Sequence, residues 1–126
     1  MGELGPVRYS DLPDVYGAHD VFAFPSISET FGHPMAEALA AGIPIVAADT
    51  AVNREVLGDA ALYHAPLRAS ELAAAVRRLD ADPTERERLV AGGRKRAEAM
   101  FDWNSHVDNL LRVFEDVLRA RRQATR

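Results

Sequence analysis

Short apolar runs separated by polar, turn-forming stretches are the main pattern in the first half of the chain. Three of them are "VFAFPS" at residues 21–26, "IPIVAAD" at 43–49 and "AALYHAP" at 60–66. Runs of this length, rich in Val, Ile and Phe, favour strands that are buried inside a sheet. A fourth, shorter strand is predicted at residues 7–9, in "GPVRYS".

Helical segments lie between these runs. "SDLPDVYGAHD" and "NREVLGD" predict short helices, and "HPMAEALAAG" predicts a longer one, in which Pro34 suits the first turn and Gly42 the position just after the end. Ser70 is expected to cap a helix over residues 71–82, and Pro83 to start another. Strands that alternate with helices predict an α/β fold, here a small Rossmann-like parallel sheet flanked by helices.

The C-terminal segment carries a continuous apolar stripe at helical spacing. The stripe comprises Trp103, Val107, Leu110, Leu111, Phe114, Val117 and Leu118. Amphipathic helices of globular proteins bury such a stripe. We therefore expect this helix to pack along the sheet, with Trp103 in the core rather than on a sugar-binding surface.

The length of the chain bounds its organisation. Its 126 residues suit a single domain that buries enough apolar surface to fold without disulfide bonds. Four strands are few for a parallel sheet, however, and the chain begins almost directly in one of them. We therefore expect residues 1–126 to form a single domain that is part of a larger protein.

Composition argues against several classes of function. The formal net charge of -4 disfavours a nucleic-acid partner, which normally selects a basic surface, and the absence of cysteine excludes thiolate chemistry. The sequence has neither an apolar run of about 20 residues nor a recognisable secretion signal. Cytoplasmic localisation is therefore expected, with membrane contact only through a longer full-length protein.

Residues suited to chemistry concentrate in "SISETFGHPMAEALAAG", between a predicted strand and the helix after it. Glu29 lies in the loop and Glu37 about one turn into the helix, where ligands of open parallel sheets bind and the helix end attracts anions. Gly32 lets the backbone approach a ligand closely, and Pro34 removes an N–H group that would lack a partner. The arrangement suits a ligand with central phosphates and hydroxyls on both sides, as in a nucleoside diphosphate sugar.

The two carboxylates by themselves leave other interpretations open. Glu29 could simply cap the helix, and Glu37 could be an ordinary acid near the positive end of the helix dipole. Paired carboxylates also occur in glycosidases and in metal sites. A metal site would need more converging acids, and only His33 lies nearby, so no metal site is predicted.

The surrounding motifs narrow these alternatives. An apolar strand ends in Pro-Ser, and Glu-x-Phe-Gly-x-Pro, a second Glu followed by Ala, a Gly-x-Pro step and Glu-Val-Leu-Gly-Asp come after it. From about residue 12 to residue 118, the chain closely resembles the C-terminal donor-binding region of retaining glycosyltransferases with the GT-B fold, of the family 4 or group 1 type. The matching residues are Pro25, Ser26, Glu29, Phe31, Gly32, Pro34, Glu37, Ala38, Gly42, Pro44, Glu55, Gly58 and Asp59.

This resemblance implies roles for the loop and the helix start. Glu29, the candidate catalytic residue, would bind hydroxyls of the transferred sugar and would not act as a nucleophile. Backbone N–H groups at Phe31 and Gly32, and at the helix start beside Pro34, would hold sugar and diphosphate oxygens. Glu37 would bind the ribose diol. The resemblance also implies transfer of a hexose from a nucleoside diphosphate sugar, with retained anomeric configuration and without a cofactor or metal ion.

The sequence departs from the family pattern in two ways. His33 stands where an apolar residue is common, and it either donates to the diphosphate or a sugar hydroxyl or is a solvated loop residue. The Arg/Lys pair that would hold the diphosphate precedes residue 7 in such proteins, and the only lysine here is Lys95, on a late predicted helix. The acceptor domain also lies earlier in these proteins. We therefore expect a partial donor domain that lacks the acceptor domain and is inactive in isolation.

Two other classes of protein compete with this interpretation. A non-catalytic fragment or assembly module would bind nucleotide, or self-associate, without turnover. A receiver-like phosphoacceptor domain would need a lysine at a strand end near an acid such as Asp49, and Lys95 is misplaced for that role.

Missing strands would expose an apolar sheet edge, so we predict a homodimer through that edge or through a displaced helix.

Overall fold

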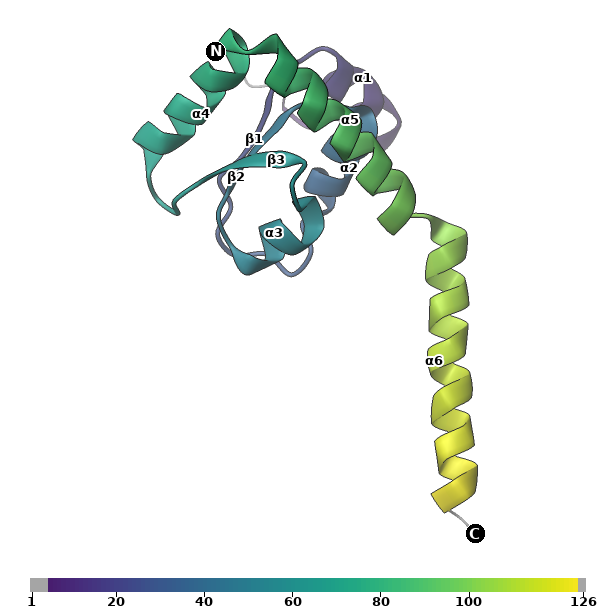
Figure 1. Cartoon of the computed structure of the whole chain (residues 1–126). Coiled ribbons are helices and arrows are strands. Elements are labelled where there is room, and N and C mark those ends of the chain that lie inside the picture. The colour runs from purple at the N-terminus through teal and green to yellow at the C-terminus, as the bar shows by residue number, and fades with distance from the viewer. Residues whose placement is uncertain (1–4, 125–126) are drawn as a thin grey trace.

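Strands and helices alternate along the chain, as the hydrophobic pattern predicts (Figure 1). The structure, a computed structural model, describes residues 5–124. A short 3₁₀ turn, η1 (Tyr9–Asp11), leads into α1 (Leu12–Gly17), and the strands are β1 (Phe22–Phe24), β2 (Ile45–Ala48) and β3 (Ala61–His64). The other helices are α2 (His33–Ala41), α3 (Ala51–Leu57), α4 (Ala69–Ala81), α5 (Pro83–Met100) and α6 (Trp103–Ala124).

The three strands form one parallel sheet in the order β1-β2-β3. β2 is the central strand, and its Ile45 aligns with Phe22 on one side and with Ala61 on the other. Every residue of β2 is buried. A parallel strand that is covered on both faces is apolar throughout, which is why this run shows no alternation of polar and apolar residues. The predicted α/β fold with a small parallel sheet is therefore confirmed.

Two apolar clusters lie on opposite faces of β2, because successive side chains of a strand point to opposite sides. Ile45 and Ala47 pack against α2 and α3. Val46 packs with Leu79 of α4 and Leu89 of α5. Each such buried aliphatic side chain contributes roughly 1.5–3 kcal/mol relative to an exposed one. The helices thus hold the sheet between two layers.

A buried glycine brings α5 close to α2. Gly93 is buried in the middle of α5, and an added Cβ would lie 3.1 Å from Cδ2 of Leu39 in α2. A glycine inside a helix costs roughly 1 kcal/mol relative to alanine. Here the missing side chain allows the two helices to approach, which gives the residue a packing role.

Two details of the predicted secondary structure are wrong. Residues 7–9 do not form a strand, so the described part of the chain has three strands rather than four. Arg8 instead pairs with Asp11 across the turn, with 2.8 Å between the guanidinium Nε and a carboxylate oxygen. Ser70 does not cap α4, because that helix begins at Ala69, two residues before the predicted start, and Ser70 lies inside it.

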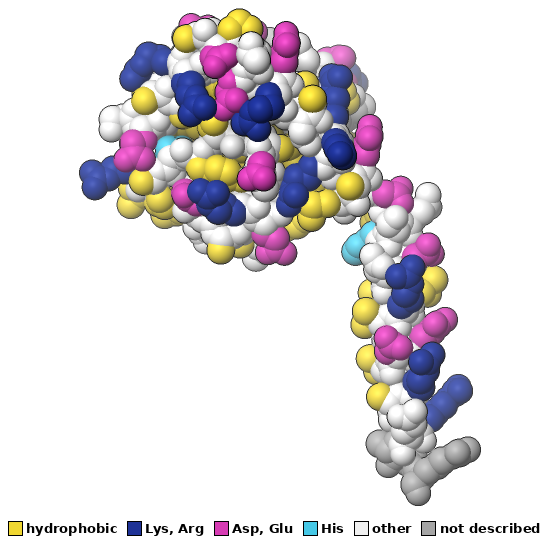
Figure 2. Space-filling view, in the orientation of Figure 1, with side chains coloured by type: hydrophobic (Ala, Val, Ile, Leu, Met, Phe, Trp, Pro, Cys, Tyr) yellow, Lys and Arg dark blue, Asp and Glu magenta, His cyan; other side chains and the backbone are white. Residues whose placement is uncertain are grey.

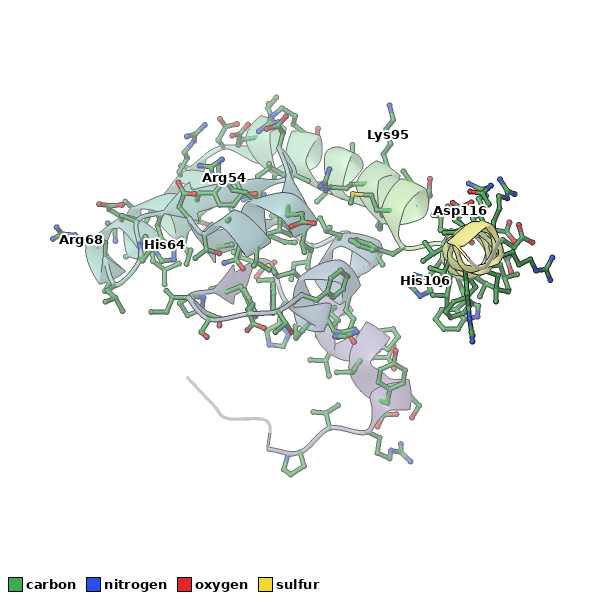
Figure 3. All side chains as sticks on the ribbon, turned by 90° about the horizontal axis from the view of Figure 1, so that it is seen from below. Arg54, His64, Arg68, Lys95, His106 and Asp116 are labelled. Carbon is green, nitrogen blue, oxygen red and sulfur yellow. The ribbon has the colours of Figure 1, made fainter. Side chains whose placement is uncertain are left out.

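The largest disagreement concerns α6. The helix forms where the apolar stripe predicts it, but it extends away from the sheet and the other helices (Figure 1). Trp103 is 73% exposed and Phe114 is 55% exposed, so the prediction that Trp103 lies in the core is wrong. Figure 2 shows hydrophobic side chains along one side of α6, and Figure 3 shows the helix end-on, apart from the other helices.

The physical reason for this error is that a helical period identifies a face but not the surface that covers it. Leu110, Leu111, Val113, Phe114, Val117 and Leu118 are all exposed along α6. Contiguous apolar surface of this kind commonly marks an interaction site. Neither α6 nor any other helix in residues 5–124 is long and apolar enough to cross a membrane.

Candidate functional site

The loop between β1 and α2 turns sharply at Gly32. This residue is the N-cap of α2 and has a φ of 79°, in the left-handed region that favours glycine. An added Cβ would lie only 2.5 Å from Cε of Met35, whose N–H donates to the Gly32 carbonyl at 2.9 Å. Pro34 follows in the first turn, as predicted. No side chain caps this helix end.

Glu29 is held by the end of the preceding strand. The Ser26 hydroxyl donates to Oε1 of Glu29 at 2.8 Å. Ser26 is in turn held by the fully buried Asn53 of α3, whose amide donates to the Ser26 carbonyl at 3.1 Å and to the Ala48 carbonyl at 2.8 Å. The backbone N–H of Asn53 donates to the Thr50 hydroxyl, which caps α3. The loop that carries Glu29 is thereby tied to the end of β2.

Glu37 is held from a different element. Tyr16 of α1 donates from its phenol oxygen to Oε2 of Glu37 at 3.1 Å. The ring of Tyr16 packs edge-on against Phe22 of β1, with 5.7 Å between the ring centroids. Burial and the hydrogen bond to Glu37 raise the pKa of Tyr16 to about 12. The phenol is therefore protonated and able to donate throughout the neutral range.

Each of the two carboxylates uses only one oxygen within the described part of the chain. Oε2 of Glu29 and Oε1 of Glu37 accept no hydrogen bond from residues 5–124. A carboxylate offers about four acceptor positions, so both acids keep capacity for further donors. Asp49 differs, because Arg54 binds both of its oxygens, at 2.5 and 2.7 Å, and these bonds lower the pKa of Asp49.

A groove of about 800 Å³ opens beside the start of α2. Phe31, His33 and Glu37 line it, together with Phe101 and Trp103 from the junction of α5 and α6. The ring of Phe31 meets the rings of His33 and Phe101 edge-on, at centroid distances of 5.1 and 5.7 Å. Glu29 does not line this groove. The structure thus brings three of the predicted residues onto one surface and leaves Glu29 outside it.

Neither Glu29 nor Glu37 forms an ion pair with a residue in the range 5–124. Arg54 is occupied by Asp49 and lies over the ring of Tyr63, 4.2 Å from its centroid. Lys95 points away from the rest of the molecule (Figure 3). Within residues 5–124, no group of three or more histidines and acids is arranged to hold a metal ion. The arrangement therefore offers hydrogen-bond acceptors and backbone donors rather than cations.

A parallel sheet with a glycine turn between its first strand and the next helix is the arrangement of a Rossmann-like ligand-binding domain. Residues 3–96 match the family of group 1 glycosyl transferases, and the chain belongs to this family. The resemblance to the C-terminal region of these GT-B glycosyltransferases is therefore confirmed. Membership of the family also removes the receiver-like alternative.

Known relatives and solved structures agree with this assignment. The chain is 32% identical over 112 residues to O-antigen chain mannosyltransferase B of Escherichia coli, a match that covers 89% of this chain and 29% of that protein. Sucrose-phosphate synthase of Thermosynechococcus elongatus aligns with a TM-score of 0.84 at 28% identity, over 93% of this chain and 30% of that one. An Anabaena protein solved in complex with UDP shares the fold, with a TM-score of 0.79 at 24% identity, over 85% and 30% of the two chains. The chain therefore spans less than a third of the length of these proteins.

The sequence pattern did not point to Tyr16, which holds Glu37, or to Asn53, which holds Ser26 beneath Glu29. Tyr16 lies 21 positions before Glu37, and Asn53 lies 27 positions after Ser26. Nothing in the local pattern links members of either pair, because the contacts depend on how α1 and α3 pack. The sequence gives only a weak indication of their role: Tyr16 and Asn53 each carry a polar group within a short predicted helix.

The turn at Gly32 generates a prediction about stability. Gly32→Ala should lower the free energy of unfolding by about 1–2 kcal/mol or more, because a left-handed backbone is costly for alanine and its Cβ would overlap Met35. Urea denaturation followed by circular dichroism measures this change. Gly17→Ala is the matched control, since nothing lies within 4 Å of an added Cβ there. Equal stability of the Gly32 variant and the unsubstituted chain would contradict the assigned backbone role.

Proposed function

We propose that this chain is the donor-binding part of a retaining glycosyltransferase, which moves a hexose from a nucleoside diphosphate sugar to an acceptor. The observation that carries the proposal is the pair of acids around the start of α2, each with one carboxylate oxygen unused by the described residues. Vicinal hydroxyls of a sugar and of a ribose are suitable donors to such oxygens. The UDP of the fold-related Anabaena protein is a nucleoside diphosphate, the ligand class we propose here.

In this proposal the ligand spans the helix start. The diphosphate accepts hydrogen bonds from the N–H groups at Phe31, Gly32 and the first turn of α2, where the dipole favours negative charge. Glu37 accepts from the ribose hydroxyls, and Glu29 accepts from hydroxyls of the transferred sugar. His33, exposed beside Phe31, is available to donate to the diphosphate or to a sugar hydroxyl.

Catalysis would rest on the charge of the departing diphosphate. Donors fixed in advance toward a developing negative charge commonly supply the largest part of a rate enhancement. Glu29 binds the sugar and does not attack it, and no metal ion or other cofactor is required. The acceptor site and further cations for the diphosphate belong to other parts of the full-length enzyme, since the chain corresponds to less than a third of its relatives.

A second candidate function is a non-catalytic module that binds nucleotide, or self-associates, without turnover. It shares the nucleotide site with the first candidate and differs in chemistry. Isothermal titration with UDP, GDP and ADP, followed by an assay of transfer from the corresponding sugar donors, separates the two. Binding of one nucleotide without transfer by any longer form of the protein would favour the module.

The role of Glu37 can be tested by substitution. Glu37→Ala should weaken binding of the preferred nucleoside diphosphate by about 1–3 kcal/mol, the scale of a hydrogen bond to a charged group. The 2′,3′-dideoxy form of that nucleotide should bind the variant and the unsubstituted chain alike, because it lacks the hydroxyls that Glu37 would bind. Titration calorimetry with both nucleotides gives the comparison. A variant that still discriminates strongly between them would show that Glu37 does not bind the ribose.

Activity should depend on parts beyond this chain. Correct positioning of an acceptor can supply about 7–11 kcal/mol of barrier lowering, so the 126-residue chain alone should show no measurable sugar transfer. Within a longer form of the protein that transfers sugar, Glu29→Ala should reduce the rate more than the nucleotide affinity, and the product should retain the anomeric configuration. NMR of the product and initial-rate kinetics measure both. Transfer by the isolated chain at a rate typical of enzymes would refute this division of roles.

The partner that we propose for the chain is a second copy of itself. The two copies would meet through the exposed apolar face of α6 or through the outer edge of β1. Light scattering should show mass rising with concentration. Phe114→Glu should suppress the rise if α6 is the surface, because Phe114 is 55% exposed in the apolar stripe. Asn109→Glu adds the same charge outside that stripe and is the control. A monomer at high concentration would contradict the proposal.

A further inference from the structure

We propose that Tyr16 is a positioning residue for the donor site: its phenol holds the carboxylate of Glu37 in one orientation, with the other oxygen available for ribose hydroxyls. The inference rests on the proposed function and extends it to a residue on a separate helix. Tyr16 itself need not touch the ligand, because it acts through Glu37.

The geometry fixes both ends of this contact. The phenol oxygen of Tyr16 lies 3.1 Å from Oε2 of Glu37 and 3.3 Å from the carbonyl oxygen of Pro34. A phenol has one proton, and hydrogen bonds to a charged acceptor are the stronger ones, so the carboxylate is the preferred partner. The ring of Tyr16 is anchored edge-on by Phe22, which stacks on Phe24 at a centroid distance of 5.8 Å. The hydroxyl group that donates to Glu37 is therefore carried by a ring whose position is fixed by its contact with Phe22.

The alternative is that the ring of Tyr16 serves packing alone. Burial and the neighbouring Glu37 raise the pKa of the phenol from 10.0 to about 12, so the proton stays in place at every pH used for assays. A raised pKa means that this contribution to stability is complete below about pH 10 and is lost as the pH rises through about 12. Tyr16→Phe separates the two roles, since it keeps the ring and removes only the donor.

The first experiment compares nucleotides that differ only at the ribose. Tyr16→Phe should weaken binding of UDP, or of whichever ribonucleoside diphosphate binds best, by about 5- to 10-fold, the scale of one lost hydrogen bond. Affinity for the 2′,3′-dideoxy nucleotide should change by less than about twofold. In a Glu37→Ala background the same substitution should have no further effect on either ligand. Equal losses for the two nucleotides, or a loss that persists without Glu37, would overturn the positioning role.

Tyr63→Phe is the matched control. Tyr63 also loses a partly buried hydrogen bond on this change, the one its hydroxyl donates to the Gly58 carbonyl at 2.6 Å, but it lies on β3 and forms no hydrogen bond with Glu29 or Glu37. It should lower stability without changing the preference for the ribonucleotide. Melting curves of all variants confirm that each binds as a folded protein.

A second readout does not depend on any ligand. NMR titration of the tyrosine ring carbons should show that Glu37→Gln lowers the pKa of Tyr16, because the negative charge of Glu37 is removed and the remaining hydrogen bond goes to a neutral amide oxygen. An unchanged pKa would overturn the contact itself. If instead the unsubstituted chain binds both nucleotides equally, the ribose role of Glu37 fails, and the positioning role fails with it. The titration and the binding assay thus distinguish failure of the contact from failure of the proposed function.

Discussion

Burial of β2 on both faces is the constraint on which the rest of the structure depends. All four of its residues are buried, and its alternate side chains pack against different helices: Ile45 and Ala47 against α2 and α3, and Val46 against α4 and the first half of α5. A parallel strand placed in this way brings its carboxyl end next to that of its neighbour. Asn53 uses this proximity, since its amide donates both to the carbonyl of Ala48, the last residue of β2, and to the Ser26 carbonyl after β1. The same packing that forms the core therefore sets the loop that carries Glu29.

Both acids of the candidate site accept a hydrogen bond from a neutral hydroxyl group rather than from a cation. This difference affects how many acceptor positions remain for a ligand. A hydroxyl from Ser26 and a phenol from Tyr16 each orient one oxygen and leave the other without a partner among residues 5–124. An arginine binding both oxygens, as in the Arg54–Asp49 pair, occupies an acceptor position on each of them. A single neutral donor therefore leaves more acceptor capacity for a ligand than an ion pair that engages both oxygens.

The fold was largely predictable from the sequence because buried strands and capped helices leave local signals. Pro34 and Gly42 mark both ends of α2 as expected, and the run at Ile45 identifies the central strand. The contact between Tyr16 and Glu37 was not predictable, because it joins two helices whose residues lie 21 positions apart and whose packing has no local sequence signal. The placement of α6 failed for a related reason: its apolar face is evident at Phe114, but periodicity carries no information about the surface opposite. The candidate acids could be located from spacing and resemblance, whereas their supports required the tertiary structure.

The exposed helix α6 and the groove beside α2 meet at the junction of α5 and α6, where they share residues. Phe101 packs edge-on against Phe31 at the mouth of the groove, and Trp103, two residues later, is both the first residue of α6 and part of the groove lining. Asp102, between them, caps α6 by accepting from the Ser105 N–H at 2.7 Å. Trp103 therefore belongs both to the lining of the groove and to the exposed apolar stripe of α6, which places the start of that stripe at the rim of the candidate site.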